Sequence, residues 1–240
     1  EPTYPAWKAG VLPLNYTRTA CCLCISVAST NISIYDEKTG KGLVRHIVTK
    51  VGIKTGEIMC VIVINGHKIP NENELVENLK TKYPEIKAIV KNINMKNTNV
   101  ILGQENINLY GNGYIEDILG EYKFKISPLS FYQVNPVQAE KLYDLGVSMA
   151  EITKNDIVFD LYCGIGTISL CMSKFAKKVY GIEIVEEAVK MAKENAQNNN
   201  VSNTEFFAGD VEIVLDDLIN NKGLKADVVM FDPPRKGLDK

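Results

Sequence analysis

The chain has 240 residues, of which 45% are hydrophobic, and a formal net charge of -2. This length and composition suffice for one or two globular domains and exclude a low-complexity chain. The apolar run at 20–28 has nine residues and is too short to span a bilayer, so we expect a soluble, cytoplasmic protein without membrane contact.

The charge is distributed unevenly along the chain. Residues 1–126 carry 15 Lys or Arg and 12 Asp or Glu, whereas residues 127–240 carry 12 and 17. The acidic half suits a cationic ligand, and the mildly basic half is the better candidate for contact with a polyanion. Ordinary scatter of surface charge explains the difference equally well.

The six cysteines lack paired CxxC spacing and indicate a reduced intracellular protein without a metal site. They lie at positions 21, 22, 24, 60, 163 and 171.

The first half of the chain predicts a small α+β domain over residues 31–126. Residues 1–30 show no periodicity and stay uncertain. A glycine turn at 38–42 comes first, and a helix is predicted at 71–83. The alternation of apolar residues predicts strands at 43–48, 58–64, 86–93, 99–102, 107–109 and 122–126.

The second half, residues 127–240, predicts a doubly wound parallel sheet. Asn135 is a typical N-cap and Pro136 suits the first helical position, which indicates a helix at 136–150. Strands and helices then alternate. The strands are expected at 157–161, 178–183, 204–208 and 226–231, and the helices at 167–176, 185–199 and 211–220. Because the last strand would leave an apolar edge open, we expect the sheet to continue beyond Lys240.

A cofactor-binding turn is predicted by residues 157–167, IVFDLYCGIGT. An apolar strand reaches Asp160 and then a turn with Gly164 and Gly166, where backbone N–H groups can approach a ligand. The next strand ends in Glu183, about twenty residues later, where a carboxylate can accept both ribose hydroxyls of an adenosine.

The turn favours S-adenosylmethionine over a dinucleotide. It lacks the G-x-G-x-x-G pattern that binds a pyrophosphate, since residue 169 is Ser. Asp160 would repel a pyrophosphate but suits the ammonium and sulfonium of S-adenosylmethionine. A nicotinamide-dependent dehydrogenase is a weaker alternative.

The segment FDPPRKG at 231–237 predicts a rigid turn at the ligand-binding edge of the sheet. Asp232 follows the last strand, and Arg235 with Lys236 adds positive charge suited to phosphates. A plain proline-rich turn is the alternative.

With these motifs the chain resembles the RNA (uracil-5-)-methyltransferase family of the 23S ribosomal RNA type. The resemblance covers residues 31–240 and rests on YDEKTGKGLVRH at 35–46, SPLSFYQVNP at 127–136, DLYCGIGT at 160–167, Glu183 and DPPRKG at 232–237. It implies S-adenosylmethionine-dependent methylation of uracil carbon 5 in RNA, either ribosomal or transfer, of which we expect ribosomal RNA. The implied architecture is a Rossmann-like class I methyltransferase domain behind a small α+β domain.

The expected cofactor residues combine the turn with positions implied by the resemblance. They are Gln133, Asp160, Tyr162, Gly164, Gly166, Thr167, Glu183, Asp210 and Asp232. The alternatives are that Tyr162 is a packing aromatic at the strand end and that Gln133 only ties the linker to a backbone group. Phe131, Asp232 and Arg235 are expected at the substrate, with Phe131 and Tyr132 either stacking on a flipped base or packing in the core. Lys38, Lys41 and Arg45 are expected to contact RNA phosphates, unless they form a solvated hairpin tip.

The resemblance also implies a cysteine nucleophile that adds to uracil carbon 6, in a Ser-Cys-Asn-Pro motif that follows DPPRKG. We expect this nucleophile and the terminal base beyond Lys240, and therefore expect residues 1–240 alone to be inactive. Cys163 does not match that role, and Cys21, Cys22 and Cys24 do not match an iron-sulfur spacing. The alternatives are a base amino-group methyltransferase, disfavoured by Arg235 where an aromatic is usual, and a noncatalytic RNA- or cofactor-binding fragment.

Overall fold

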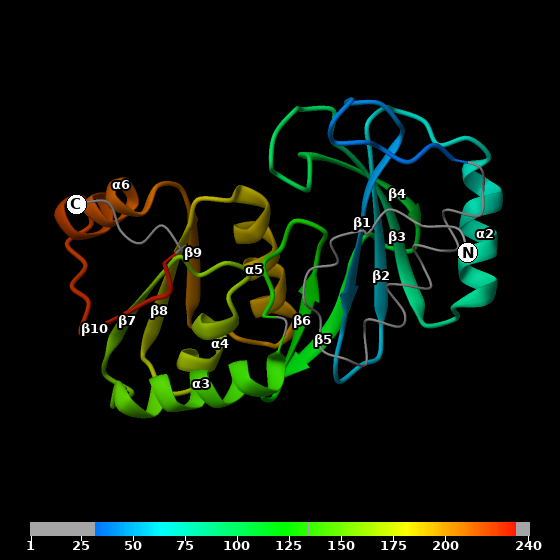
Figure 1. Cartoon of the computed structure of the whole chain (residues 1–240). Coiled ribbons are helices and arrows are strands. Elements are labelled where there is room, and N and C mark those ends of the chain that lie inside the picture. Colours follow the sequence, from blue (N-terminus) through cyan, green and yellow to red (C-terminus); the bar gives the residue numbers. More distant parts are fainter. Residues whose placement is uncertain (1–31, 134, 234–240) are drawn as a thin grey trace. The chain divides into compact units, whose positions relative to one another are not determined.

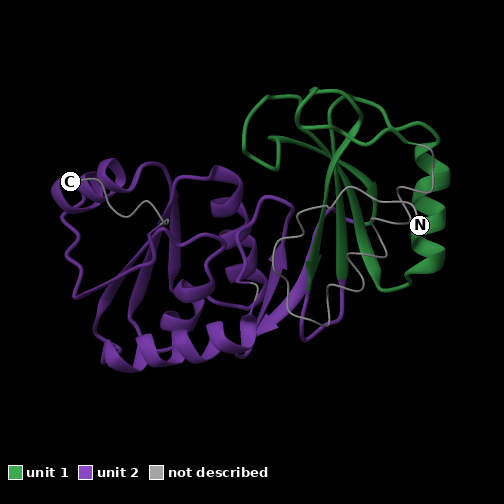
Figure 2. Ribbon diagram, in the orientation of Figure 1, with its two compact units in different colours: residues 1–51, 58–111 green, residues 52–57, 112–240 purple. Residues whose placement is uncertain are grey.

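The computed structural model describes residues 32–133 and 135–233 and divides into two compact units. Figure 1 shows the elements, and Figure 2 shows the first unit, residues 1–51 and 58–111, and the second, residues 52–57 and 112–240. The division at 111/112 lies before the expected boundary at 126/127. The uncertain segment 1–30, with three of the cysteines, lies outside the described residues.

The first unit contains a four-stranded sheet in the order β1-β2-β3-β4. β2 pairs antiparallel with β1 and parallel with β3, and β3 pairs antiparallel with β4. The parallel pair requires a crossover, which α2 (Glu72–Lys82) supplies between β2 and β3. The strands are β1 (Val44–Val51), β2 (Ile58–Ile64), β3 (Ile86–Ile93) and β4 (Glu105–Tyr110).

The core of this unit forms where α2 covers one face of the sheet. Leu75 and Leu79 of α2 pack in one apolar cluster with Ile62 of β2 and Ile89 of β3. The helix predicted at 71–83 is thus confirmed as α2, with its apolar face against the sheet.

The strand expected at 99–102 is not formed; these residues form bends and irregular backbone. The buried side chain of Asn94 donates from Nδ2 to the carbonyl oxygens of Val100 (2.7 Å) and Ile101 (3.0 Å). Because a side-chain amide satisfies these carbonyls, the segment folds as a loop, and the strand starts later, at β4.

After the loop at 52–57, the second unit contains a hairpin of β5 (Ile115–Leu119) and β6 (Tyr122–Ile126). β5 was not predicted from the sequence. After the linker comes α3 (Pro136–Met149), where the side chain of Asn135 accepts a hydrogen bond from the backbone of Gln138 at 3.2 Å. The predicted N-cap and Pro at the helix start are confirmed.

A parallel sheet in the order β10-β7-β8-β9 forms the rest of the second unit and confirms the predicted doubly wound fold. Its strands are β7 (Ile157–Leu161), β8 (Lys178–Glu183), β9 (Thr204–Ala208) and β10 (Val228–Phe231). The connecting helices are α4 (Thr167–Ser173), α5 (Glu186–Asn198) and α6 (Val211–Asp216), followed by the π-helical turn η1 (Asp217–Asn221). α4 and α6 are shorter than predicted.

Successive residues of β7 face opposite sides of this sheet, as the period of a strand requires. Val158 packs with Val147 of α3 and Met172 of α4, whereas Phe159 packs with Val211 of α6 and Leu218 of η1. With both faces covered, the open edge at the carboxyl ends of the strands is the place for a ligand. Within the described ranges, no helix is long and apolar enough to cross a membrane.

Candidate functional site

The turn after β7 contains three residues in the left-handed region of backbone conformation. Their φ values are 65° at Tyr162, 54° at Gly164 and 83° at Gly166. A Cβ added at Gly164 would meet no atom within 4 Å, whereas one at Gly166 would lie 3.1 Å from the Phe206 ring. Gly166 thus allows close packing behind the turn, and Gly164 leaves its front open to a ligand.

Glu183, at the end of β8, is hydrogen bonded to this turn. Its Oε2 accepts a hydrogen bond from the backbone N–H of Gly164 at 3.1 Å, and its Oε1 accepts one from Val185 at 2.9 Å. The structure therefore brings together two of the predicted cofactor residues, the turn glycine and the acid of the next strand.

Asp160 lies behind the turn, with only 1% of its surface exposed. The Ser169 hydroxyl donates to its Oδ2. Burial raises the pKa of Asp160 to about 7; hydrogen bonds from Ser169 oppose this rise, and the charges of Asp232 and Glu183 add to it. Asp160 therefore acts on the site through its charge, from its buried position behind the turn, and does not present an open carboxylate to a ligand.

An acidic residue stands at or just after the carboxyl end of each of the four parallel strands. Asp160 lies in β7 and Glu183 ends β8, whereas Asp210 follows β9 and Asp232 follows β10. Asp210 is exposed and caps α6 by accepting a hydrogen bond from the backbone of Glu212 at 3.0 Å. This set of carboxylate acceptors fits a ligand that carries positive charge and hydroxyl groups.

Tyr143 of α3 is a site residue that sequence reasoning missed. Burial, the largest influence, raises the pKa of its phenol; hydrogen bonds with the Thr167 and Gln133 side chains lower it, and the charge of Asp232 raises it. Two predicted cofactor residues, Thr167 and Gln133, thus lie beside this phenol, and the charge of a third, Asp232, acts on it. The helical periodicity of 136–150 indicates only a buried position at 143, so nothing in the sequence pattern separates it from a core aromatic.

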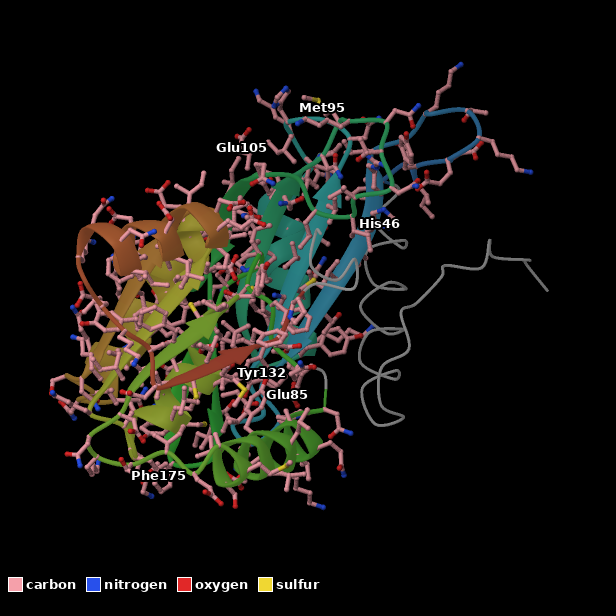
Figure 3. The ribbon with its side chains drawn as sticks, turned by 90° about the vertical axis from the view of Figure 1, so that its left-hand side faces the viewer. His46, Glu85, Met95, Glu105, Tyr132 and Phe175 are labelled. Atoms are coloured by element: carbon pink, nitrogen blue, oxygen red, sulfur yellow. The ribbon has the colours of Figure 1, made fainter. Side chains whose placement is uncertain are left out.

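The two aromatic residues of the linker have different roles. The Tyr132 hydroxyl donates to Oδ2 of the buried Asp117 at 3.1 Å, and the backbone N–H of Lys54 donates to Oδ1 at 2.8 Å (Tyr132 is labelled in Figure 3). Tyr132 therefore fastens the linker to the β5–β6 hairpin. Phe131 is 71% exposed and presents its ring to solvent.

The described cysteines of the second unit are not suited to nucleophilic attack. Cys163 is buried, and burial raises the pKa of its thiol well above its usual value. Burial also raises the pKa of Cys171, to about 12. Both thiols are therefore protonated at neutral pH, whereas only a thiolate is an effective nucleophile. In the part of the chain that the structure describes, no group of three or more His, Cys, Asp or Glu could hold a metal.

The basic turn before β1, in the first unit, presents Lys38 and Lys41 to solvent. The Asp36 carboxylate closes this turn by accepting hydrogen bonds from the Lys38 backbone and the Thr39 hydroxyl, both at 2.9 Å. The two lysines remain candidates for phosphate contact. Arg235 lies outside the described residues.

Arg45 is only 5% exposed, which corrects the expected phosphate contact at this residue. Its Nη1 donates to the carbonyl oxygens of Asn94 (2.9 Å) and Lys96 (2.8 Å), and its guanidinium lies 4.7 Å from the centroid of the Tyr35 ring. Arg45 holds the loop at 94–96 in place, and its charge is not available to an external polyanion.

The fold and the arrangement of this site define a class I, Rossmann-like methyltransferase domain. In agreement, residues 152–234 match the family described as a methyltransferase domain. Two curated relatives are both named as uncharacterized RNA methyltransferases. The one from Caldanaerobacter subterraneus is 52% identical to this chain, and the one from Clostridium tetani is 50% identical. Each match covers 88% of this chain, and 46% and 45% of the relatives, so the chain spans about half their length.

A solved structure is similar over both units. It is the Pyrococcus abyssi tRNA (uracil-54, C5)-methyltransferase in complex with S-adenosyl-L-homocysteine, with a TM-score of 0.68 and 26% identity. The match covers 90% of this chain and 50% of the other.

Proposed function

We propose that the protein methylates carbon 5 of uracil in RNA with S-adenosylmethionine as the methyl donor. The observation that carries the proposal is the acidic edge of the sheet, where Glu183 is bonded to the open turn at Gly164. The similarity to a uracil-54 C5-methyltransferase crystallised with S-adenosyl-L-homocysteine supports both the donor and the target atom.

In this proposal the cofactor supplies a methyl group on a positively charged sulfur. Glu183 would accept the ribose hydroxyls and Asp210 would approach the adenine, while the backbone at Gly164 would lie beside the amino acid portion. Gln133, Tyr162 and Thr167 would complete the pocket. The carboxylates of Asp232 and, when it is ionised, of Asp160 would favour the sulfonium over a neutral thioether, because opposite charges attract.

The substrate in this proposal is a uracil that has left its base stack. Phe131 offers an exposed ring on which a flipped base can stack, and the linker that carries it leads to Gln133. Lys38 and Lys41 would contact phosphates without reading sequence. Ribosomal RNA is our proposed substrate, on the strength of the sequence resemblance.

Uracil carbon 5 becomes nucleophilic only after a thiolate adds to carbon 6. Cys163 and Cys171 are buried, with raised pKa values, and neither is assigned this role. We place the nucleophile in the Ser-Cys-Asn-Pro motif of the family, outside the described residues.

A methyl-transfer assay on the full-length protein tests the proposal. Unmodified 23S ribosomal RNA and unmodified transfer RNA are incubated separately with labelled S-adenosylmethionine, and the nucleosides are identified by mass spectrometry. We expect 5-methyluridine in the ribosomal RNA. A methyl group on an exocyclic amino group would refute the reaction, and 5-methyluridine in transfer RNA alone would refute the substrate.

A further inference from the structure

Asn195 of α5 is a fully buried polar residue that joins two parts of the second unit. Its Nδ2 donates to the carbonyl oxygen of Ile165 at 3.1 Å, and its Oδ1 accepts from the backbone N–H of Lys125 at 2.8 Å. Ile165 stands between the two glycines of the cofactor turn, and Lys125 belongs to β6. One side chain thus connects the turn to the hairpin.

Both segments that Asn195 connects carry or lead to predicted site residues. The turn presents Gly164, whose N–H also binds Glu183. β6 leads directly into the linker that holds Phe131 and Gln133. An amide held by two backbone groups fixes the distance between these segments, because the Asn195 side chain is fully buried and an unpaired polar atom there would be costly.

Asn199, one helical turn after Asn195, makes a similar pair of bonds to the hairpin. Its Nδ2 donates to the carbonyl of Lys123 at 2.7 Å, and its Oδ1 accepts from the N–H of the same residue at 2.8 Å. Its Nδ2 also donates a hydrogen bond to the backbone carbonyl oxygen of Asn195 at 2.8 Å. These partners belong to β6 and α5, so Asn199 anchors the hairpin, while Asn195 anchors the hairpin and the turn together.

We propose that Asn195 is a positioning residue, which holds the cofactor turn in register with the hairpin and with the substrate-contacting linker that follows it. The inference rests on the proposed function, because it assigns the cofactor to the turn. Its structural part, control of the turn by Asn195, is measurable without any ligand.

The test compares Asn195→Asp with Asn199→Asp. Each change keeps an oxygen that can accept the Lys125 or Lys123 N–H and removes an amide donor. Only the change at 195 takes a donor away from the turn. The 240-residue chain is studied by amide hydrogen exchange of residues 163–168 without ligand, and by calorimetric titration with S-adenosylhomocysteine.

For Asn195→Asp we expect at least tenfold faster exchange in the turn and at least tenfold weaker binding of S-adenosylhomocysteine. For Asn199→Asp we expect both values within about twofold of the wild type. Equal effects in the two variants, or an unchanged turn in Asn195→Asp, would overturn the inference. Failure of the wild-type chain to bind S-adenosylhomocysteine would count against the proposed function, while the exchange data would still decide the role of Asn195.

A buried carboxylate at 195 can prevent folding, so a second pair of variants removes the side chains without adding charge. Asn195→Ala and Asn199→Ala are compared at temperatures where both are fully folded by circular dichroism. Faster exchange at 163–168 in Asn195→Ala alone would support the inference, and identical exchange in the two variants would refute it.

Discussion

The carboxylate of Glu183 holds the backbone of Gly164, with 3.1 Å between the acceptor oxygen and the donor nitrogen. The other oxygen accepts from Val185, so both oxygens have a partner before any ligand arrives. A carboxylate has about four acceptor sites, and two ribose hydroxyls can therefore bind without displacing these backbone donors. The two backbone bonds therefore fix the orientation of the acid in the absence of a ligand.

Replacement of Glu183 by Ala should weaken binding of S-adenosylhomocysteine by about 1–3 kcal/mol, because it removes charged hydrogen bonds to the ribose. Calorimetric titration of the 240-residue chain measures the change. The control is Glu187→Ala, an exposed acid in the first turn of α5, which should leave the affinity unchanged. Unchanged affinity in Glu183→Ala would remove the ribose assignment.

The buried Asp160 should make stability depend on pH. Its folded pKa of about 7 lies above the ordinary value near 3.8, so between about pH 4 and pH 7 the folded state binds more protons than the unfolded state. The free energy of unfolding should therefore fall as the pH rises through this window, by at most about 1.4 kcal/mol per pH unit, and should level off above it.

Urea unfolding of wild type and Asp160→Asn between pH 4.5 and pH 8 checks this expectation, in steps of roughly half a pH unit. The neutral amide cannot ionise, so the fall should be absent in the variant. Asp216→Asn, a change at an exposed acid, should retain the wild-type profile. Parallel profiles for wild type and Asp160→Asn would show that Asp160 ionises normally.

Changes at the two linker aromatics should affect different properties of the full-length protein, methyl transfer at Phe131 and stability at Tyr132. Phe131→Ala should leave the melting temperature and cofactor affinity unchanged and reduce methyl transfer to RNA, because the ring is 71% exposed. Tyr132→Phe should lower stability by about 1–3 kcal/mol, since the buried Asp117 loses a hydrogen bond. Normal transfer by Phe131→Ala would exclude base stacking at this position.

The basic residues near β1 should separate into surface and structural groups. Lys38→Ala with Lys41→Ala should flatten the log-log salt dependence of RNA binding by about 1–2 units, with little loss of stability. Arg45→Ala should lower the melting temperature instead, because the carbonyls of Asn94 and Lys96 lose their donor. An unaltered salt slope in the double lysine variant would show that Lys38 and Lys41 do not contact RNA phosphates.

The parallel sheet of the second unit was predictable because its apolar runs, turn glycines and N-cap are local signals. The strand at 99–102 was predicted wrongly for a reason that lies elsewhere in the chain, in the Asn94 amide that takes up its carbonyls. β5 was missed because Asp117, a buried acid, interrupts its apolar pattern and is satisfied by Lys54 and Tyr132.

The candidate site was predictable only as a set of strand ends. Asp160 and Glu183 follow from the order of strands, but the full burial of Asp160 and the partial burial of Glu183 depend on what packs around the ends of β7 and β8. Tyr143 and Asn195 carry no sequence signal of their own, because each lies in an ordinary helical pattern. Arg45 looked like a surface cation because the sequence does not show which carbonyls lie beside it.

The loop at 52–57 belongs to the second unit, although the strands on either side of it belong to the first. Within the second unit the Lys54 backbone reaches Asp117, and the Thr55 hydroxyl donates to the Glu116 carbonyl at 2.6 Å. No single cut in the chain separates the two units. An exchange of the first unit for another domain would have to join the chain at three positions at once, 51/52, 57/58 and 111/112, so a single crossover cannot exchange it.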